Sequence, residues 1–314
     1  MIKKYALGIA AIIAATSCSN GPKDKYTDTA TTGVVEISAD ESFAPIIAQQ
    51  AEVFENIYTM AGIIPLNTSE KEAISLLLTD SVRLAITTRM LSAQERQSLE
   101  DRKFFPKEIK IATDAIALIV NRENPDTLIS IPVLKKILTG KITSWQQINP
   151  KSELGALSLV FDNPNSSTVR FSIDSICASE PLAGALYAQN DNPSVIDYVE
   201  KTPGAIGVIG VSWITRQETD SSNTRFDHRI RVMAVSKQEH ATAENSVKPY
   251  QAYIALGEYP LRRDVYALLT DPRSGLASGF TSFLTSDRGQ RIILRAGLVP
   301  ATQPLRIVNI RENI

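Results

Sequence analysis

From Gly33 onwards the sequence alternates between short β-rich runs and longer amphipathic runs. A strand, a helix and a second strand in succession pair in parallel, with the helix covering the sheet. We therefore predict an α/β fold of mostly parallel sheets flanked by helices. Strands are expected at 34–38, 63–66, 84–87, 157–161, 205–209, 231–235 and 265–269, and helices at 44–58, 70–78, 92–100, 131–138, 167–178, 194–202, 275–285 and 288–296. The helix at 92–100 opens with a capping box, Ser92 followed by Glu95, and the polar stretch 216–227 is expected to be a loop.

The apolar run 109–120 is interrupted by Thr113 and Asp114. Such an interruption is a place where a strand can leave one lobe for another, and we place a hinge there. A chain of 314 residues is long enough for two domains with a sizeable core. We predict that residues 33–114 and 230–314 form lobe I and that residues 115–229 form lobe II.

The N-terminus has the features of a secretory signal sequence. Lys3 and Lys4 precede an apolar run, 5–15, that is too short to span a bilayer. Small residues then lead directly to Cys18, as lipoprotein signal peptidase requires, so residues 1–18 are predicted to be a lipoprotein signal peptide with Cys18 lipidated. The alternative is ordinary secretion with Cys18 removed or idle. The polar residues 19–32 are expected to be a flexible tether, which makes the protein extracytoplasmic and anchored to a membrane by lipid.

Composition narrows the partners. A net charge of −1 and a hydrophobic fraction of 43% give no reason to propose nucleic acid or an anionic membrane surface. Two cysteines and two histidines leave no zinc-like cluster, so we predict no metal and no cofactor. Cys177 lies in an apolar-periodic run and is expected to be a small buried hydrophobe. We expect a monomer.

Several segments carry a family resemblance in one consistent order. They are AIALIVN at 115–121, Asn-Pro at 124–125, LKKILTGKITSW at 134–145, TPGAIGVI at 202–209, EYPL at 258–261 and FLTSDRGQRIILRAGLVP at 283–300. Together they resemble the phosphate-binding proteins of bacterial phosphate ABC transporters, within the type 2 PBP-like superfamily. The resemblance implies a two-lobed, type II periplasmic-binding-protein-like fold, with a small oxyanion such as inorganic phosphate bound in the cleft. It also implies an ABC transporter permease as recipient, and no enzymatic reaction.

The ligand-facing loops match the family less well. Its first loop is rich in Gly, Ser and Thr, whereas this chain has ADESFAP at 39–45. Its Gly-Ser-Gly-Thr-Arg loop corresponds to NSST at 165–168, with the arginine displaced to Arg170. Sulfate, molybdate and tungstate therefore stay open as ligands.

A desolvated phosphate needs donors on nearly every oxygen, and helix N-termini, hydroxyls and a cation supply them. The candidate hydroxyls lie at predicted strand ends and helix starts, and they are Ser42, Thr87, Thr88, Ser166, Ser167 and Thr168. The bland alternative for each is an ordinary N-cap or strand end. The candidate cations are Arg89 and Arg170, since a guanidinium grips two oxygens at once; the alternative is a solvated helix face.

Asp114 is a candidate selector between anions. Phosphate near neutral pH still carries a proton that an ionised carboxylate can accept, while sulfate carries none and would be repelled. The family resemblance implies this role for Asp114, and the alternative is a turn cap at the hinge. Asp40 and Glu41 would weaken anion binding if both faced the cleft, and we expect at least Glu41 to point to solvent. The alternative, with both facing inward, would indicate a ligand other than free phosphate.

Two rival functions remain at this point. A phosphoester hydrolase would need a base beside one of the serines, and His228 and His240, the only histidines, lie in a hydrophilic stretch typical of a surface. A sensor would keep the binding fold and signal through a partner instead of a permease. Nothing within the sequence excludes the sensor.

Overall fold

The computed structural model describes residues 28–217 and 224–304. The predicted signal peptide, Cys18 and the tether as far as residue 27 lie outside these ranges, as do residues 218–223 of the predicted loop at 216–227. Among the described residues, no helix combines the length and the apolar character needed to cross a membrane.

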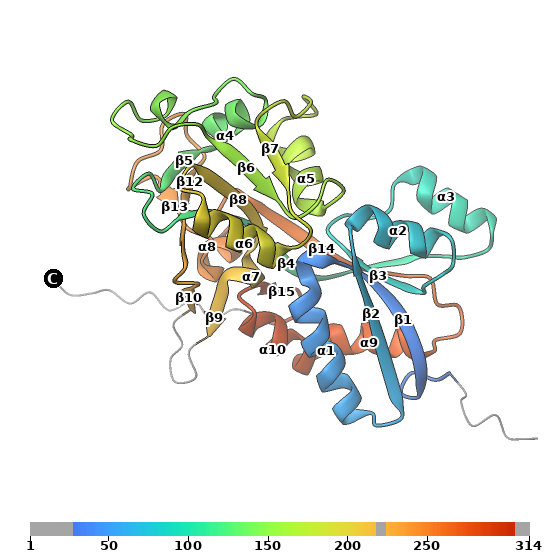
Figure 1. The fold of residues 1–314 in the computed structure, drawn as a ribbon. Coiled ribbons are helices and arrows are strands. Elements are labelled where there is room, and N and C mark those ends of the chain that lie inside the picture. Colours follow the sequence, from blue (N-terminus) through green and yellow to red (C-terminus); the bar gives the residue numbers. More distant parts are fainter. Residues whose placement is uncertain (1–27, 218–223, 305–314) are drawn as a thin grey trace, which may run out of the picture.

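One ten-stranded sheet runs through the molecule (Figure 1). Its strands lie in the order β2-β1-β3-β14-β4-β8-β6-β7, and β11 and β15 also pair with β4. The bounds are β1 Gly33–Asp40, β2 Ala61–Thr68, β3 Leu84–Thr87, β4 Lys107–Asn121, β6 Ser158–Phe161, β7 Leu186–Ala188, β8 Ala205–Gly210, β11 Ile230–Val232, β14 Arg262–Leu269 and β15 Val299–Pro300.

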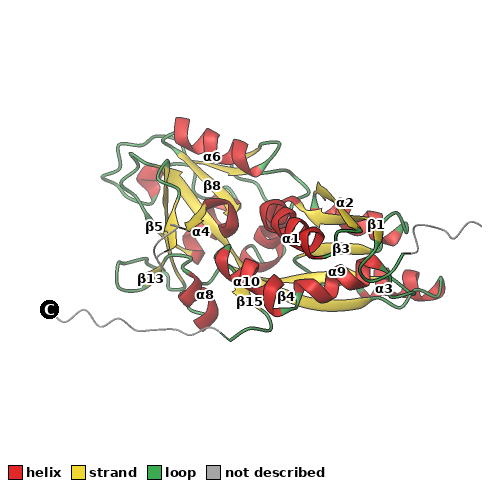
Figure 2. Cartoon of the chain, turned by 90° about the horizontal axis from the view of Figure 1, so that it is seen from below, coloured by secondary structure: helices red, strands yellow, loops and turns green. Residues whose placement is uncertain are grey.

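Strand β4 joins two lobes. Its first part pairs with β14 as far as Ala115, and its second part pairs with β8 from Ile116 onwards. The change of partner therefore falls next to the predicted hinge. We call the side with β1, β2, β3 and β14 lobe I and the side with β6, β7 and β8 lobe II; Figures 1 and 2 show the two groups separated along β4.

Parallel pairing holds inside each lobe. Strand β1 pairs in parallel with β2 and β3, and β6 pairs in parallel with β7 and β8. The predicted crossover pattern is thus confirmed at both ends of the sheet. The two central strands differ, because β14 and β4 run antiparallel to their neighbours.

Helices cover both faces of the lobe I strands. Helices α1 Ala44–Ile57, α9 Leu276–Leu284 and α10 Asp287–Arg295 pack together, with the Phe54 ring against Phe280 and Phe283. A separate apolar cluster under α2 Glu70–Leu78 and α3 Ala93–Asp101 includes Leu77, Leu99 and Leu268. The predicted capping box at the start of α3 is present.

Five helices and two short helical turns cover lobe II among the described residues. They are α4 Ile131–Leu138, α5 Ser167–Phe171, α6 Asn192–Lys201, α7 Val211–Ile214 and α8 Gln251–Leu256, with short helical turns at Trp145–Gln147 (η3) and Ser172–Ile176 (η4); a further turn, Glu41–Phe43 (η2), lies in lobe I between β1 and α1. Trp145 is fully buried in this lobe, as is Cys177, which confirms the prediction for that cysteine.

Three predicted elements differ in detail. The helix expected at 167–178 is α5 followed by the π-helical turn η4. Part of the expected loop is a hairpin, since β9 Thr215–Gln217 pairs with β10 Thr224–Phe226. The strand expected at 231–235 is broken at Met233, where β11 leaves β4 and β12 Ala234–Ser236 pairs instead with β5 Leu128–Ser130 and β13 Ser246–Val247.

These pairings bear on the lobe bounds. Strand β11 lies against residues 119–121 of β4, and β12 lies against β5, so both are hydrogen-bonded to strands that follow the hinge. The predicted return to lobe I at residue 230 is thus too early for this segment, because long-range pairing holds it on lobe II. We propose that the return falls between Gly257 and Arg262, where β14 begins.

Candidate ligand-binding site

Asp114 and Arg263 form a buried ion pair at the junction of the lobes. They face each other in register on β4 and β14, and Arg263 Nε donates to Asp114 Oδ2 over 2.9 Å. Asp114 is fully buried and Arg263 is 5% exposed. Burial raises the pKa of Asp114, while the Arg263 charge and its hydrogen bond oppose that rise.

Two serines extend this pair across the junction. Arg263 Nη1 donates to Ser167 Oγ over 2.6 Å, and Ser167 opens α5 in lobe II. Ser42 Oγ, from lobe I, lies 3.4 Å from Ser167 Oγ. The Phe43 ring lies 5.4 Å from the Arg263 guanidinium, a distance typical of a cation–π contact. Residues from four separate chain segments therefore meet at one buried point, and we call Ser42, Asp114, Ser167 and Arg263 the central cluster.

The central cluster is incompletely hydrogen-bonded. Asp114 Oδ1 and Arg263 Nη2 are both buried and have no partner among the described residues. Leaving a buried polar atom unpaired costs about 1 to 3 kcal/mol, and more when the group is charged. Gly210 on β8 lies beside them, since a Cβ there would lie 3.7 Å from Arg263 Nη2, an ordinary contact distance. A donor and an acceptor thus stand unpaired where a small polar ligand would satisfy both.

The other hydroxyls at the start of α5 are already engaged. Ser166 Oγ caps the helix by accepting from Val169 N, and it lies 2.8 Å from Thr168 Oγ1. Thr168 Oγ1 donates to Asp162 Oδ1 over 2.9 Å. All three side chains are buried. Of the predicted trio, Ser167 alone contacts Arg263 in the hydrogen bonds of this segment, while Ser166 and Thr168 fix the turn that presents it.

Arg170 and Thr88 belong to a second charged group, at the edge of the junction. Arg170 Nε contacts Glu70 Oε2 at 2.5 Å, and Arg170 Nη2 donates to Thr88 Oγ1 over 2.7 Å. Thr88 donates its hydroxyl and its backbone N–H to Glu70 Oε1, over 2.6 and 2.7 Å. Burial opposes ionisation of Glu70, but the charge and hydrogen bonds of Arg170, with those of Thr88, outweigh it and lower the pKa of Glu70. We call Glu70, Thr88 and Arg170 the rim clamp, because Arg170 comes from lobe II and the other two from lobe I.

Arg89 and Thr87 are not brought to the central cluster by their hydrogen bonds. Both terminal nitrogens of Arg89 contact the carboxylate of Glu95, over 2.7 and 2.8 Å. The Thr87 hydroxyl donates to the carbonyl of Arg89 over 2.8 Å. The two terminal nitrogens of Arg89 are therefore already hydrogen-bonded to the first turn of α3.

The acidic first loop turns inward. Asp40 is buried at the end of β1; its Oδ1 accepts from Ser42 N over 2.8 Å and its Oδ2 has no partner among the described residues. Burial raises the pKa of Asp40 to about 6. The Glu41 carboxylate accepts from the side chain and the backbone N–H of Asn192 at the start of α6, and burial raises its pKa to about 7. The expectation that Glu41 points to solvent is therefore wrong, because the N-terminus of a distant helix supplies donors for it.

Arg263 is absent from the residues that the sequence predicts for this site. The predicted strand begins at residue 265, so the charges at 262–264 fall outside it, whereas β14 begins at Arg262. The alternation of buried and exposed residues along a strand could have identified Arg263. Val265, Ala267 and Leu269 face inward, so the same two-residue period, continued towards the N-terminus, places Arg263 inside and Arg262 outside.

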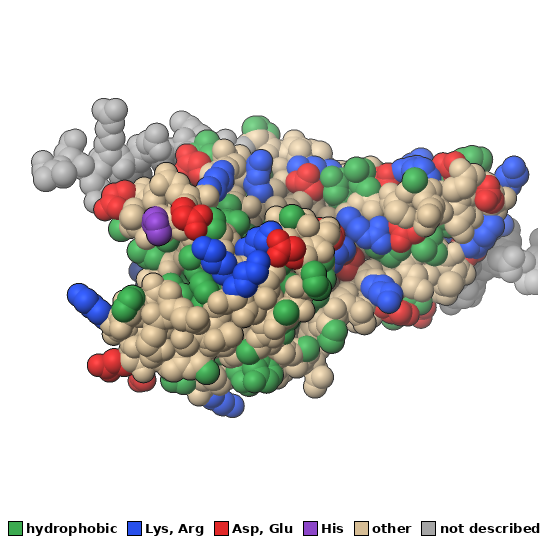
Figure 3. All heavy atoms as spheres, turned by 90° about the horizontal axis from the view of Figure 1, so that it is seen from above, with side chains coloured by type: hydrophobic (Ala, Val, Ile, Leu, Met, Phe, Trp, Pro, Cys, Tyr) green, Lys and Arg blue, Asp and Glu red, His purple; other side chains and the backbone are tan. Residues whose placement is uncertain are grey.

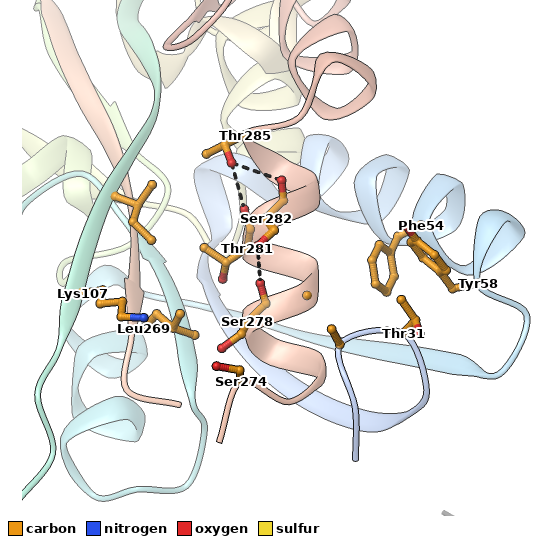
Figure 4. A pocket seen from close by; sticks show the side chains of 13 residues that line it. Thr31, Phe54, Tyr58, Lys107, Leu269, Ser274, Ser278, Thr281, Ser282 and Thr285 are labelled. Carbon is orange, nitrogen blue, oxygen red and sulfur yellow. Dashed lines mark hydrogen bonds between the residues drawn. The ribbon is translucent and has the colours of Figure 1, made fainter. Parts of the chain in front are cut away.

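A cavity of about 420 Å³ lies elsewhere, in lobe I beside α1 and α9 (Figure 4). Hydroxyls line it, but Ser282 and Thr285 donate to carbonyls of their own helix, as Thr281 does. Lys107 is the single cation among its lining residues. With three of its hydroxyls bonded to carbonyls and one cation among its lining residues, this cavity lacks the buried, unpaired donor and acceptor of the central cluster.

The face of the molecule seen in Figure 3 carries mixed charge. Figure 3 shows lysine and arginine side chains beside acidic ones across one face, without a field of one sign. His228 and His240 are exposed, whereas Ser42 and Ser167 are buried, so neither histidine is placed to activate those serines. Within the described ranges, no group of His, Cys, Asp and Glu could hold a metal ion.

Comparison with known proteins gives the family. A model described as the PBP superfamily domain matches residues 25–288. The chain belongs to the PBP superfamily. Among curated PBP relatives, the phosphate-binding protein PstS of Bacillus subtilis (strain 168) is 24% identical over 301 residues, which cover 92% of this chain and 90% of the relative.

Two solved structures show the same fold. One is a protein from Clostridium perfringens crystallised with bound phosphate, with a TM-score of 0.70, 22% identity and coverage of 86% of this chain and 100% of that one. The other is an ABC-type phosphate transport receptor from Vibrio cholerae, with a TM-score of 0.64, 22% identity and coverage of 85% and 100%. The predicted family resemblance and the two-lobed, type II periplasmic-binding-protein-like fold are confirmed.

Proposed function

We propose that this protein is the extracytoplasmic substrate-binding component of an ABC transporter, that it encloses inorganic phosphate between its lobes, and that it delivers phosphate to a membrane permease without changing it chemically. The named relatives support this proposal, since the Bacillus subtilis relative is a phosphate-binding protein and the Vibrio cholerae neighbour is a phosphate transport receptor. Lipidation at Cys18 would hold the protein at the membrane.

The observation that carries the proposal is the unpaired atoms of the central cluster. Arg263 Nη2 can donate to a bare phosphate oxygen, and the Ser42 and Ser167 hydroxyls lie beside it. Asp114 Oδ1 can accept the proton of a P–OH group. A fully deprotonated tetrahedral anion would instead meet the Asp114 carboxylate as a buried like charge, which favours phosphate over sulfate.

The remaining predicted residues take supporting roles in this proposal. Ser166 and Thr168 hold the turn that presents Ser167, and Thr88 and Arg170 hold the lobes together at the rim. Thr87 and Arg89 are left out of the proposed ligand contacts, because their polar atoms bond to α3 and to its leading loop.

Titration calorimetry with phosphate and with sulfate tests the proposal. We expect one phosphate per chain and a clear preference over sulfate. Replacing Asp114 with Asn should narrow that preference by about 1.5 to 3 kcal/mol, the scale of a hydrogen bond to a charged group, because the like-charge rejection of sulfate is removed. Equal affinities for the two anions in the unaltered protein would contradict the proposal.

A further inference from the structure

Asp40 presents a second buried carboxylate oxygen with no partner. It ends β1 and is 1% exposed, and Ser42 N holds its Oδ1 in place. Its Oδ2 is unpaired among the described residues, as Asp114 Oδ1 is. Ser42 connects the two, since the residue whose backbone fixes Asp40 also contributes its hydroxyl to the central cluster.

The residues around Asp40 carry too little positive charge to neutralise a bound dianion. Arg263 interacts electrostatically with both Asp40 and Asp114, so one guanidinium serves two carboxylates. Two further carboxylates raise the pKa of Asp40: that of Glu70 on α2, which Arg170 neutralises, and that of Asp162 after β6. Glu41, next in the chain, is drawn to Asn192. The central cluster is therefore short of positive charge even before an anion enters.

We propose that Asp40 is a second proton acceptor and a specificity-determining residue, so that the site takes the monoanion that carries two protons, dihydrogen phosphate, and disfavours hydrogen phosphate. This inference rests on the proposed function. Dihydrogen phosphate has two O–H groups for the two unpaired carboxylate oxygens, and two bare oxygens for Arg263 Nη2 and the serine hydroxyls. Hydrogen phosphate has one O–H group, so one carboxylate would face a bare, charged oxygen without a hydrogen between them.

The ionisation state of Asp40 agrees with this role. Although burial raises its pKa to about 6, Asp40 is ionised at neutral pH and can accept a proton from a ligand. Glu41 has a pKa of about 7 and also gains charge in this range, but its oxygens are occupied by Asn192. Glu41 is therefore the matched control, because it is a nearby titrating carboxylate without a free acceptor.

The test is calorimetry with inorganic phosphate from about pH 5.5 to about pH 8.5. Where hydrogen phosphate dominates in solution, the affinity of the unaltered protein should fall about tenfold per pH unit, since the bound form becomes rarer by that factor. Binding there should take up one proton, counted from the heats in two buffers of different ionisation enthalpy. The ligand and Asp40 titrate as a coupled pair, so this proton is assigned to the pair and not to either group alone.

Asp40→Asn should bind hydrogen phosphate as well, so its affinity should fall less than about threefold per pH unit and its proton uptake should drop below about half a proton. Glu41→Gln should keep the steep fall and the uptake of the unaltered protein. The inference is overturned by phosphate binding with a flat pH profile in the unaltered protein, or by equal flattening in Glu41→Gln and Asp40→Asn. No binding of phosphate at any pH would instead contradict the proposed function itself.

Discussion

The lobe junction contains two acid–arginine pairs that differ in how fully they are satisfied. In the rim clamp, Glu70 receives bonds from Arg170 and from both donors of Thr88. In the central cluster, Arg263 and Asp114 each keep a buried polar atom without a partner among the described residues. A satisfied pair is a structural link, whereas an unsatisfied one needs a further partner, and we propose that the ligand is that partner. The contrast separates two arginines that look alike in sequence.

Removing Arg263 should have the largest effect on binding. Arg263→Ala deletes the one cation of the central cluster and should weaken phosphate binding by about 2 to 5 kcal/mol, the usual loss when one partner of a buried charged contact is truncated. Calorimetry measures the loss. Exposed Arg262 provides the control, and Arg262→Ala should bind as the unaltered protein does.

A folding defect would leave the Arg263→Ala result ambiguous, so Arg263→Lys is a second variant. Lysine keeps the charge but lacks the planar fork. We expect folded protein, by thermal unfolding, with clearly reduced affinity for phosphate. Full affinity in this variant would contradict the role assigned to Arg263 Nη2.

The unpaired Asp40 carboxylate beside the central cluster should also make the free energy of unfolding depend on pH. Burial raises its pKa from the ordinary 3.8 to about 6, so between these values the folded protein retains a proton that the unfolded chain has released. The free energy of unfolding of the ligand-free protein should therefore fall, by roughly 3 kcal/mol, as the pH rises through this window, and stay lower above it. Denaturant titrations of Asp40→Asn should lack this component. Parallel pH profiles for the two proteins would refute it.

Removing Arg170 should affect lobe closure more than ligand contact. Arg170→Ala leaves Glu70 without its cation, and opening of the lobes lets water reach that carboxylate. We expect a more expanded ligand-free protein by small-angle scattering and a loss of about 1 kcal/mol or less in phosphate binding. Asp174→Asn is the control, since Asp174 bonds the same arginine from an exposed position. A loss as large as that of Arg263→Ala would erase the distinction between the two pairs.

The smallest effect belongs to Arg89. Its fork is bonded to Glu95, so Arg89→Ala should change phosphate affinity by less than about 0.5 kcal/mol, as is usual for a substitution away from a site. Calorimetry again measures it. A tenfold loss of phosphate affinity would indicate that Arg89 contacts the ligand after all.

Local signals in the sequence predicted the elements well. The helices Glu70–Leu78 and Ile131–Leu138 and the strand Leu84–Thr87 have the predicted bounds, because caps and apolar periods act over a few residues. Glu95 of the capping box that starts α3 also accepts hydrogen bonds from Arg89. The sequence does not predict this contact, because it depends on where the arginine side chain points.

The missing information concerns partners far apart in the chain. Arg263 meets Asp114 across 149 residues, and Glu41 meets Asn192 across 151. Strand β11 stays with lobe II because it pairs with the far end of β4. Periodicity could have turned Arg263 inward, but no local pattern identifies the carboxylate opposite it.

The continuity of β4 has a mechanical consequence. Asp114 lies where this strand changes partner, between Arg263 on one side and the first pairing with β8 at Ile116 on the other. A rotation of one lobe against the other moves residues near its axis least. If Asp114 accepts a proton from the bound anion, as we propose, the residue that distinguishes phosphate from sulfate would change its position little when the lobes close.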